Sequence, residues 1–461
     1  MFSRAMKDAS KISDLLMRQE EIHIVTHIDA DGIAAGTIAK KSLDREGIEN
    51  TIRFVKQLDE DTIEEIKDTG KMTWFTDLGS GIISKLDGLD YVITDHHMPD
   101  IDGGERIHNW RHFNPHTYGI DGSKSISGAG LAYMISISMN RENRDMADLA
   151  MVGASGDLQD AALCRFFGWN RKIIDIGKKE GVLGTMVDLR MFGRHTRPLY
   201  KLLQYSDDPF FPGLSGRESA CISFLKSLGI SDGGREKRWI ELSPDDRKRV
   251  TSALVKLLIS KGFGSAFSSR LVGEVCELKR EKAGTELRDV KEYATLLNST
   301  ARYGYAEVGM RICMGDREEY LKKANDLLKN HRRHIVNGIQ FVKKEGVQEY
   351  GMLQYFNAGD HIRDTVVGII AGIILHSREA KNDNPIVVFA DKDGREVKAS
   401  ARTTAPLVSR GVDLSKAMQK AAYQLGGTGG GHEMAAGATI PRGTEDEFLK
   451  MLDKEIRNQL T

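Results

Sequence analysis

Cysteine is scarce in this sequence, and its few copies are not spaced to bind zinc or to form a disulfide framework. No two of them are separated by only two residues, as the paired thiols of a zinc knuckle are. We therefore expect reduced thiols, which are the usual state in a cytosolic protein. The cysteines are Cys164, Cys221, Cys276 and Cys313.

Long hydrophobic runs and an excess of one charge are also missing. The apolar run at residues 366–375 is far shorter than the roughly 20 residues that cross a bilayer, so it predicts a buried helix. Residues 1–8 lack the apolar core of a signal peptide. Lys plus Arg and Asp plus Glu number 66 each, so a nucleic-acid groove would have to be a local basic patch. Together these features predict a cytoplasmic protein with no membrane segment.

The first part of the chain has the pattern of a parallel sheet covered by helices. Short apolar runs alternate there with helical stretches, and this alternation is typical of βαβ units. We predict helices at residues 33–46, 60–67, 130–139 and 146–154.

The rest of the chain divides into a helical part and a second α/β part. Residues 196–325 predict a mainly helical intervening region, and residues 316–344 predict a long, partly exposed connecting helix. The chain of 461 residues is long enough for two or three domains. We predict domains at residues 1–195, 196–325 and 326–461. Strand patterns return at residues 352–356, 385–390, 395–400 and 434–440.

Acidic and histidine side chains follow the ends of three predicted strands. Because the carboxyl ends of parallel strands share one edge of a sheet, we expect these side chains to converge there. They are His27, Asp29 and Asp31 after residues 21–26, Asp77 after residues 72–76, Asp95, His96 and His97 after residues 91–94, and Asp157, which follows a helix that could fold back over this edge.

This donor set is suited to divalent cations. Carboxylates and imidazoles without thiolates favour Mn²⁺ or Mg²⁺ over a structural zinc ion. Two such ions about 4 Å apart can clamp the attacking and leaving oxygens of a phosphoryl displacement. Taken singly, each motif is more often a turn, a helix cap or a solvated pair. Their repetition at strand ends favours a metal site.

A glycine run near the C-terminus is a candidate phosphate site. Residues 429–431 leave backbone N–H groups open to close approach, although a glycine-rich turn is the alternative. His432 follows the run directly. Arg402, on a separate segment, could hold a phosphate with two hydrogen bonds.

These motifs resemble the DHH phosphoesterase superfamily. The N-terminal motifs are Asp29-Ala30-Asp31-Gly32, Asp77, Asp95-His96-His97 and Gly156-Asp157. Residues 429–437 resemble the glycine-rich signature of the DHHA1 substrate domain, and residues 399–402 resemble its phosphate-binding segment. The length and the intervening region are similar to archaeal RecJ-like single-strand exonucleases of the GINS-associated type.

The resemblance implies roles for individual residues. Asp29 and Asp77 would hold one Mn²⁺, and Mg²⁺ is the alternative ion. A second set, Asp31, Asp77, His96 and Asp157, would hold the other ion, with Asp77 bridging and His27 as an additional candidate ligand. His97 would contact the substrate phosphate or the attacking water, and Asp95 would orient a histidine. The implied substrate-binding residues are Ser400, Arg402, Gly430, Gly431 and His432.

The implied fold and function follow the same resemblance. We expect an α/β protein with an N-terminal parallel-sheet DHH domain and a smaller DHHA1 domain, joined by the helical region and the connecting helix. The expected activity is exonucleolytic hydrolysis of single-stranded DNA or RNA, 5′ to 3′, in replication and repair, with the GINS complex and the replicative helicase as partners. The alternatives are a phosphodiesterase for short oligonucleotides or cyclic dinucleotides and a GINS-binding scaffold with weak or no activity.

Overall fold

The computed structural model describes residues 1–100, 110–206, 209–375, 377, 379–381, 383–392 and 394–460. The chain forms two compact units, Met1–Asp326 and Leu327–Thr461. The boundary between them falls within the long helix α14 (Glu319–Glu345).

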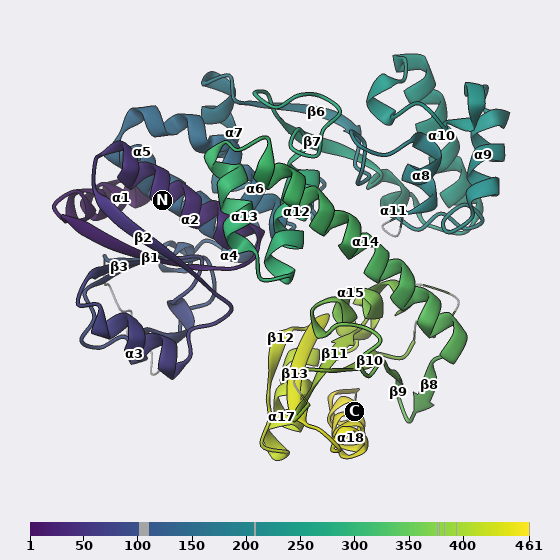
Figure 1. Ribbon diagram of the computed structural model, residues 1–461. Coiled ribbons are helices and arrows are strands. Elements are labelled where there is room, and N and C mark those ends of the chain that lie inside the picture. Colours follow the sequence, from purple (N-terminus) through teal and green to yellow (C-terminus); the bar gives the residue numbers. More distant parts are fainter. Residues whose placement is uncertain are drawn as a thin grey trace. The chain divides into compact units, whose positions relative to one another are not determined.

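A five-stranded parallel sheet forms the centre of the first unit. Its strand order is β2-β1-β3-β4-β5 (Figure 1), and every pairing is parallel. Thr26 pairs with Thr76 and Thr76 pairs with Thr94, so the residues that follow these three threonines leave the sheet at one edge. The strands are β1 (Glu21–His27), β2 (Glu49–Val55), β3 (Met72–Thr76), β4 (Tyr91–Thr94) and β5 (His112–Phe113).

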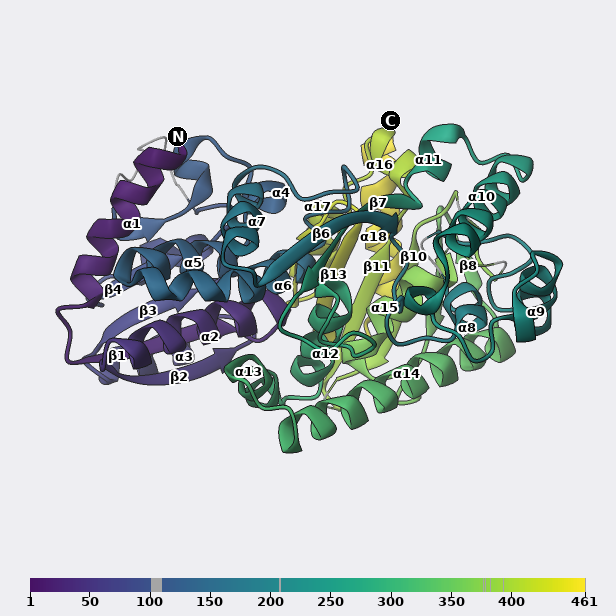
Figure 2. The same ribbon diagram turned by 90° about the horizontal axis from the view of Figure 1, so that it is seen from above.

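Helices cover both faces of this sheet. Alternate strand residues point to opposite faces, and Val25, Phe75 and Ile93 pack in one core with Ile63 and Ile66 of α3. Helices α2 and α5 lie on the other side of the sheet from α3 (Figures 1 and 2). The helices of this part are α1 (Phe2–Leu16), α2 (Ala30–Arg45), α3 (Glu60–Asp68), α4 (Gly122–Ser125), α5 (Gly128–Met139), α6 (Ala147–Gly156) and α7 (Trp169–Lys179).

A helical layer with its own core is inserted between the two strands of an antiparallel pair. These strands are β6 (Leu183–Leu189) and β7 (Val272–Leu278). Leu199, Leu225 and Trp239 are among the buried residues of the layer's core. The prediction missed this strand pair because β6 has no clear apolar alternation, and Val187 at its centre is 77% exposed. The helices are α8 (Leu199–Gln204), α9 (Glu218–Ser227), α10 (Pro244–Ser260) and α11 (Ser265–Ser269).

Two helices after this layer return to the sheet-containing part. Helix α12 (Val290–Arg302) packs against α6, and α13 (Ala306–Met314) packs against α2. Helix α12 therefore lies over α6, which directly precedes Asp157, and α13 lies over α2, which carries Asp31.

The second unit is built on a six-stranded mixed sheet with the order β12-β13-β11-β10-β9-β8. On β10, Val387 and Phe389 face a core shared with α17 and α18, whereas Ile386 and Val388 face a core shared with α15. The elements are β8 (Gln348–Tyr350), β9 (Leu353–Asn357), α15 (Asp364–Leu375), β10 (Ile386–Asp391), β11 (Glu396–Arg402), α16 (Ala405–Ser409), α17 (Leu414–Gln424), β12 (Thr428–His432), β13 (Ala435–Pro441) and α18 (Glu445–Leu460).

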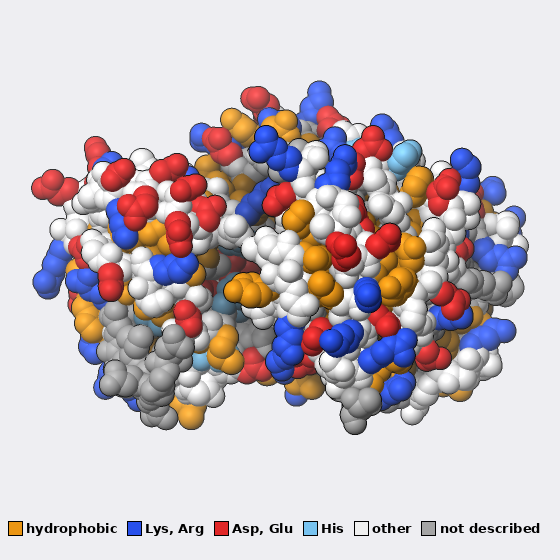
Figure 3. Space-filling view, turned by 90° about the horizontal axis from the view of Figure 1, so that it is seen from below, with side chains coloured by type: hydrophobic (Ala, Val, Ile, Leu, Met, Phe, Trp, Pro, Cys, Tyr) orange, Lys and Arg blue, Asp and Glu red, His pale blue; other side chains and the backbone are white. Residues whose placement is uncertain are grey.

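The predicted α/β class, with an N-terminal parallel sheet and a second α/β part, is confirmed. The predicted helices at the start of the chain agree with α2, α3, α5 and α6 to within a few residues. None of the described helices is long and apolar enough to span a membrane. Basic and acidic side chains are interspersed on the face shown in Figure 3, as the balanced composition predicts.

Candidate metal centre

The side chains predicted to bind metal converge at the edge where β1, β3 and β4 end. Their candidate ligand atoms form three groups, and the atoms of each group lie within 4.8 Å of one another. Asp77 and His96 each belong to two groups, so the groups form one continuous centre. The groups are His27, Asp29 and Asp77; Asp31, His96 and Asp157; and Asp77, His96 and His97.

The Asp77 carboxylate lies between the first two groups. Its Oδ2 atom is 3.8 Å from His27 Nδ1, and its Oδ1 atom is 3.4 Å from His96 Nε2. His27 Nδ1 is also 3.0 Å from Asp29 Oδ2, and His96 Nε2 is 3.0 Å from Asp157 Oδ2. One carboxylate with an oxygen toward each group is the arrangement that a ligand shared by two ions requires.

Two buried atoms at this centre lack a hydrogen-bond partner among the described residues, Asp77 Oδ1 and His96 Nε2. Burying a polar atom without a partner is costly. The Gly122 carbonyl accepts a hydrogen bond from His96 Nδ1 at 3.0 Å, so the proton is on Nδ1 and Nε2 is left as a donor atom for a metal. The unpartnered atoms and the oxygen-rich donor set fit Mn²⁺ or Mg²⁺.

The carboxylates of the centre repel one another. Burial, together with Asp31 and Asp29, raises the pKa of Asp77 well above its usual value. Burial and the charges of Asp157 and Asp29 raise the pKa of Asp31 to about 7. Burial also opposes ionisation of Asp29, but the hydrogen bond and charge of His27, the Gly32 N–H and the charge of His97 together outweigh that effect and lower the pKa of Asp29 to about 2. Bound cations would allow all of these carboxylates to ionise together.

Local backbone structure fixes the two aspartates that follow β1. Asp29 is the N-cap of α2, and its Oδ1 accepts the Gly32 N–H at 2.9 Å. Asp31 lies in the first turn of the same helix and points to the start of α5. There its oxygens accept the Gly128 N–H at 2.7 Å and the Ala129 N–H at 3.0 Å. Two helix N-termini therefore position the pair.

Glycines allow the helices to approach the carboxylates closely. A Cβ atom on Gly128 would lie 2.5 Å from the Asp77 side chain, and one on Gly153 would lie 2.2 Å from Asp31 Oδ1. Asp77 itself has a φ of 60°, a left-handed conformation that non-glycine residues adopt at a cost. The surrounding packing holds this conformation at the centre.

Asp95 orients His97. Its Oδ1 accepts from His97 Nδ1 at 2.7 Å, and its Oδ2 accepts from the Ser80 N–H at 2.9 Å. Burial opposes ionisation of Asp95, but His97 outweighs it and lowers the pKa. The His97 side chain is 54% exposed, so its Nε2 atom is accessible to a substrate.

Sequence reasoning missed two residues that support this pair, Ser80 and Asn114. The Asn114 amide donates to Ser80 Oγ at 2.9 Å and to the His97 carbonyl at 2.8 Å. Asn114 directly follows β5, so a signal was available: it is another polar residue after a strand of the same sheet. Ser80 carried no comparable signal, because only its position in a turn brings its N–H group to Asp95.

The predicted substrate residues lie in the second unit, in two rows across its sheet. Ser400 and Gly430 pair with Gly437 from opposite sides. Arg402 and His432 pair with Ala435 in the same way. Gly368 of α15 leaves room there, since a Cβ atom on it would lie 2.7 Å from Arg402 Nη2.

The glycine run forms part of strand β12 and is neither a loop nor a turn. Residues 429–431 pair with β13, and β12 is the edge strand of the sheet. A Cβ atom on Gly429 would lie 2.7 Å from the Met418 carbonyl of α17, so this glycine is required by helix packing. A Cβ atom on Gly430 would meet nothing within 4 Å, so the space beside Gly430 is open.

Two family models match the chain. The DHH-CID domain matches residues 191–272, and the DHHA1 domain matches residues 351–458. The chain therefore contains a DHH-CID domain and a DHHA1 domain. A relative, the uncharacterized protein MJ0831 of Methanocaldococcus jannaschii, is 29% identical over 445 residues, which are 95% of this chain and 94% of the relative.

Solved structures of other proteins share the fold. RecJ from Thermus thermophilus in complex with Mn²⁺ has a TM-score of 0.60 and 16% identity; the match covers 98% of this chain and 55% of RecJ, so the chain spans about half of that protein. CDC45 from Entamoeba histolytica has a TM-score of 0.67 and 12% identity, and the match covers 98% of this chain and 99% of CDC45. The chain thus shares the fold of these structures and contains DHH-CID and DHHA1 domains.

Proposed function

We propose that the protein is a metal-dependent exonuclease that hydrolyses phosphodiester bonds of single-stranded DNA. The observation that carries this proposal is the Asp77 carboxylate, which lies between two groups of donor atoms and has a buried oxygen that makes no hydrogen bond among the described residues. The fold likeness to a manganese-bound exonuclease RecJ supports the nuclease activity. RNA as a further substrate, 5′ to 3′ polarity and a role in replication and repair belong to the same proposal.

The residues of the centre have separate tasks. His27, Asp29 and Asp77 would hold one divalent cation, and Asp31, Asp77, His96 and Asp157 would hold the other. Two bound cations supply an activated water and neutralise charge on the phosphoryl group. The N–H groups of Gly128 and Ala129 keep the Asp31 carboxylate fixed. Gly122 keeps the His96 ring turned with Nε2 toward the aspartates.

His97 is proposed to bind a phosphate oxygen. The hydrogen bond and charge of Asp95 raise the pKa of His97 despite the opposing effect of burial, so the ring favours the imidazolium form. An imidazolium Nε2–H donates a charge-assisted hydrogen bond to an anionic oxygen. Ser400, Arg402, Gly430, Gly431 and His432 of the DHHA1 domain are proposed to hold another phosphate of the strand.

The fold likeness to CDC45 supports a second candidate function, a replication scaffold. In this role the protein binds the GINS complex and the replicative helicase, and the DHH fold serves as a frame. The DHH-CID domain at residues 191–272 is the part proposed to carry such contacts.

Digestion of end-labelled substrates tests these proposals. Single-stranded DNA and RNA and a dinucleotide are incubated with Mn²⁺, Mg²⁺ or EDTA, and products of 5′- and 3′-labelled strands are compared. We expect stepwise shortening of long single strands that requires Mn²⁺ or Mg²⁺ and is lost in Asp77→Asn. Cleavage of the dinucleotide alone would indicate the oligonucleotide phosphodiesterase. No cleavage of any substrate, with retained binding of purified GINS, would leave the scaffold function.

A further inference from the structure

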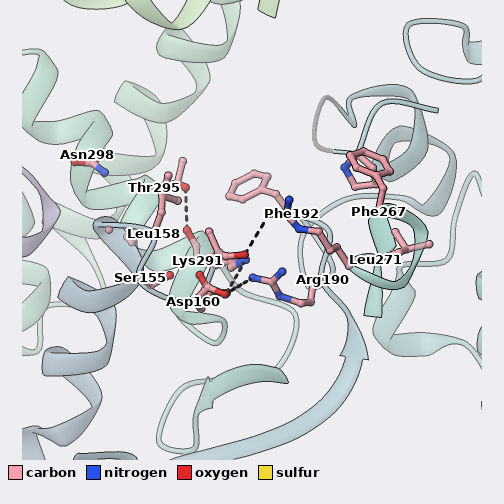
Figure 4. A pocket seen from close by; sticks show the side chains of 15 residues that line it. Ser155, Leu158, Asp160, Arg190, Phe192, Phe267, Leu271, Lys291, Thr295 and Asn298 are labelled. Carbon is pink, nitrogen blue, oxygen red and sulfur yellow. Dashed lines mark hydrogen bonds and ion pairs between the residues drawn. The ribbon is translucent and has the colours of Figure 1, made fainter. Parts of the chain in front are cut away.

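A pocket of about 300 Å³ lies within the first unit (Figure 4). Its walls come from the end of α6 and the loop after it, from the segment after β6, and from α11 and α12. Its volume is at the lower end of the range for small-molecule sites. The charged and aromatic residues that line the pocket are not among the proposed metal ligands.

The pocket adjoins the metal centre. Ser155 and Gly156 line it and directly precede Asp157. Asn298 also lines it, and its Oδ1 accepts the backbone N–H of Ala30 at 3.0 Å, between the two aspartates Asp29 and Asp31. A ligand that fills the pocket would therefore lie beside a group bound at the centre.

Three cationic side chains and one carboxylate line this pocket. Asp160 is 2% exposed at its side chain, and its Oδ2 is 2.5 Å from Arg190 Nη2 and 2.9 Å from Lys291 Nζ (Figure 4). Arg270, at the end of α11, is the third cation; its Nη2 donates to the Ala161 carbonyl at 3.2 Å. The excess of positive charge favours an anionic ligand.

The charged cluster is not saturated by its own contacts. Asp160 Oδ1 and Arg190 Nε are buried and have no hydrogen-bond partner among the described residues. Most buried polar atoms are hydrogen-bonded, so these two atoms leave hydrogen-bonding capacity at the pocket. The remaining hydrogen-bonding capacity therefore points to a polar ligand.

Two aromatic rings complete the lining. Phe267 stacks on Phe263, with ring centroids 5.0 Å apart and planes inclined by 29°. The guanidinium carbon of Arg197 lies over the Phe192 ring, 4.7 Å from the centroid of that ring. Both rings are supported from one side and border the pocket, as a platform for a flat base requires.

We propose that this pocket is a nucleotide subsite, which holds the nucleotide next to the scissile phosphate of a single strand. This proposal rests on the proposed nuclease function. The base packs against Phe192 or Phe267, and Arg270 with Lys291 binds the phosphate. The subsite makes the enzyme act on strands in preference to small diesters, because a short diester cannot fill it.

Binding in the absence of metal tests the subsite separately from hydrolysis. The dissociation constant of a fluorescent oligothymidylate of about six nucleotides is measured in EDTA over a range of salt concentrations. We expect Arg270→Gln to weaken binding about tenfold and to reduce the slope of log Kd against log salt by about 0.7, since one phosphate contact is lost. Phe192→Leu should weaken binding about tenfold without changing the slope, because stacking alone is lost.

Matched variants make the result specific. Arg235→Gln removes an exposed arginine of the same helical layer outside the pocket and should leave both Kd and the slope unchanged. Arg270→Lys should restore the slope. If Arg270→Gln and Phe192→Leu bind like the wild type, or if Arg235→Gln weakens binding equally, the subsite is wrong. Thermal unfolding verifies that each variant is folded; Lys291→Gln replaces Arg270→Gln, and Phe267→Leu replaces Phe192→Leu, if either does not fold.

A separate measurement distinguishes failure of the nuclease proposal from failure of the subsite. Hydrolysis of bis(p-nitrophenyl) phosphate by the wild type with Mn²⁺ reports the metal centre without a nucleotide. If this diester and the long strand both remain intact, the proposed function fails whatever the binding data. If strands are cleaved but the pocket variants bind normally, only the subsite fails.

Discussion

Two buried clusters of acidic residues around a histidine occur in the first unit, and they differ in how their charges are balanced. The first is the metal centre. The second, which we call the Arg194 cluster, consists of Asp188, Arg194, His195, Glu277, Arg288, Asp289 and Glu292.

In the Arg194 cluster the protein supplies its own cations. Arg194 is 1% exposed and lies 3.2 Å from Asp188, 3.5 Å from Glu277 and 3.2 Å from Asp289. His195 Nε2 is 3.2 Å from Glu277 Oε1. The four carboxylate side chains of this cluster all have hydrogen-bond partners, and the cluster joins the β6–β7 pair to α12.

At the candidate metal centre the described carboxylates form ion pairs with histidines, and the charge of Arg302 also acts on Asp29. The consequence is visible in the carboxyl groups. Burial and the neighbouring aspartates raise the pKa of Asp77 well above its usual value. In the Arg194 cluster, burial and Asp289 raise the pKa of Glu292 to about 7, but His195, Arg194 and Arg288 together outweigh burial at Glu277 and lower its pKa to about 2. The two clusters thus differ in their partners: the described carboxylates pair mainly with arginines in one and with histidines in the other.

The largest effect is expected for Asp77→Asn. We expect kcat on labelled single-stranded DNA with Mn²⁺ to fall about a thousandfold or more, because the shared carboxylate is lost. In EDTA the melting temperature should stay equal or rise, since one repelling charge is removed. Added Mn²⁺ should stabilise the wild type and not the variant. A variant that kept a tenth of the wild-type rate would contradict the role of Asp77.

The Arg194 cluster should show the reverse behaviour. Arg194→Met leaves several buried carboxylates without their cation, so the free energy of unfolding should fall by about 3–5 kcal/mol. Urea unfolding followed by circular dichroism measures this change. Arg249→Met is the control: Arg249 pairs with Asp246 on the surface, where a pair is worth at most about 1 kcal/mol. Equal effects of the two substitutions would remove the distinction between the clusters.

A smaller effect is expected for Asp95→Asn, which changes the support of His97 without changing a proposed ligand. We expect kcat to fall about 10- to 100-fold, as for other residues that orient a site. Loss of the Asp95 charge should lower the pKa of His97. The imidazolium form would then persist only to a lower pH, and the alkaline fall in activity should shift in that direction. A rate profile with an unchanged alkaline limb would argue against His97 as the phosphate donor.

The smallest effect is expected in the acid stability of the fold. The folded pKa of Glu277, about 2, lies below its ordinary value of 4.5. The unfolded chain therefore takes up this proton first, and stability from Glu277 should be lost as the pH falls from 4.5 toward 2. Unfolding midpoints at a series of pH values should decline less steeply in Glu277→Gln than in the wild type. Parallel declines in the two proteins would refute this assignment.

The centre could be predicted from sequence because each of its parts is local. Asp29, Asp77 and His96 follow strands whose apolar runs are evident, and a parallel sheet brings strand ends together. Their close approach is also found in the structure, although their role as ligands remains a prediction. The three-part domain division likewise remains a prediction.

The other features depend on contacts between distant segments. Arg194 and Glu277 are far apart in the chain, and no local pattern distinguishes them from surface charges. The strands of the β6–β7 pair are stabilised by each other, so neither carries a strong pattern alone. For the same reason the pocket could not be predicted: Arg190, Arg270 and Lys291 come from three segments. The strand conformation of the glycine run could not be predicted either, because its packing against α17 is a tertiary constraint; its role in binding phosphate remains a prediction.

The position of Asp31 under the first turn of α5 has a consequence for the newly made chain. Asp31 is fixed by the N–H groups of Gly128 and Ala129, and its partners at the centre extend to Asp157. The first proposed group, His27, Asp29 and Asp77, is complete once β3 and the following Asp77 have been made, whereas the second group needs Asp157, which follows α6. A nascent chain would therefore be able to hold the first proposed ion before the second, and a chain that stopped before α6 would lack the second group.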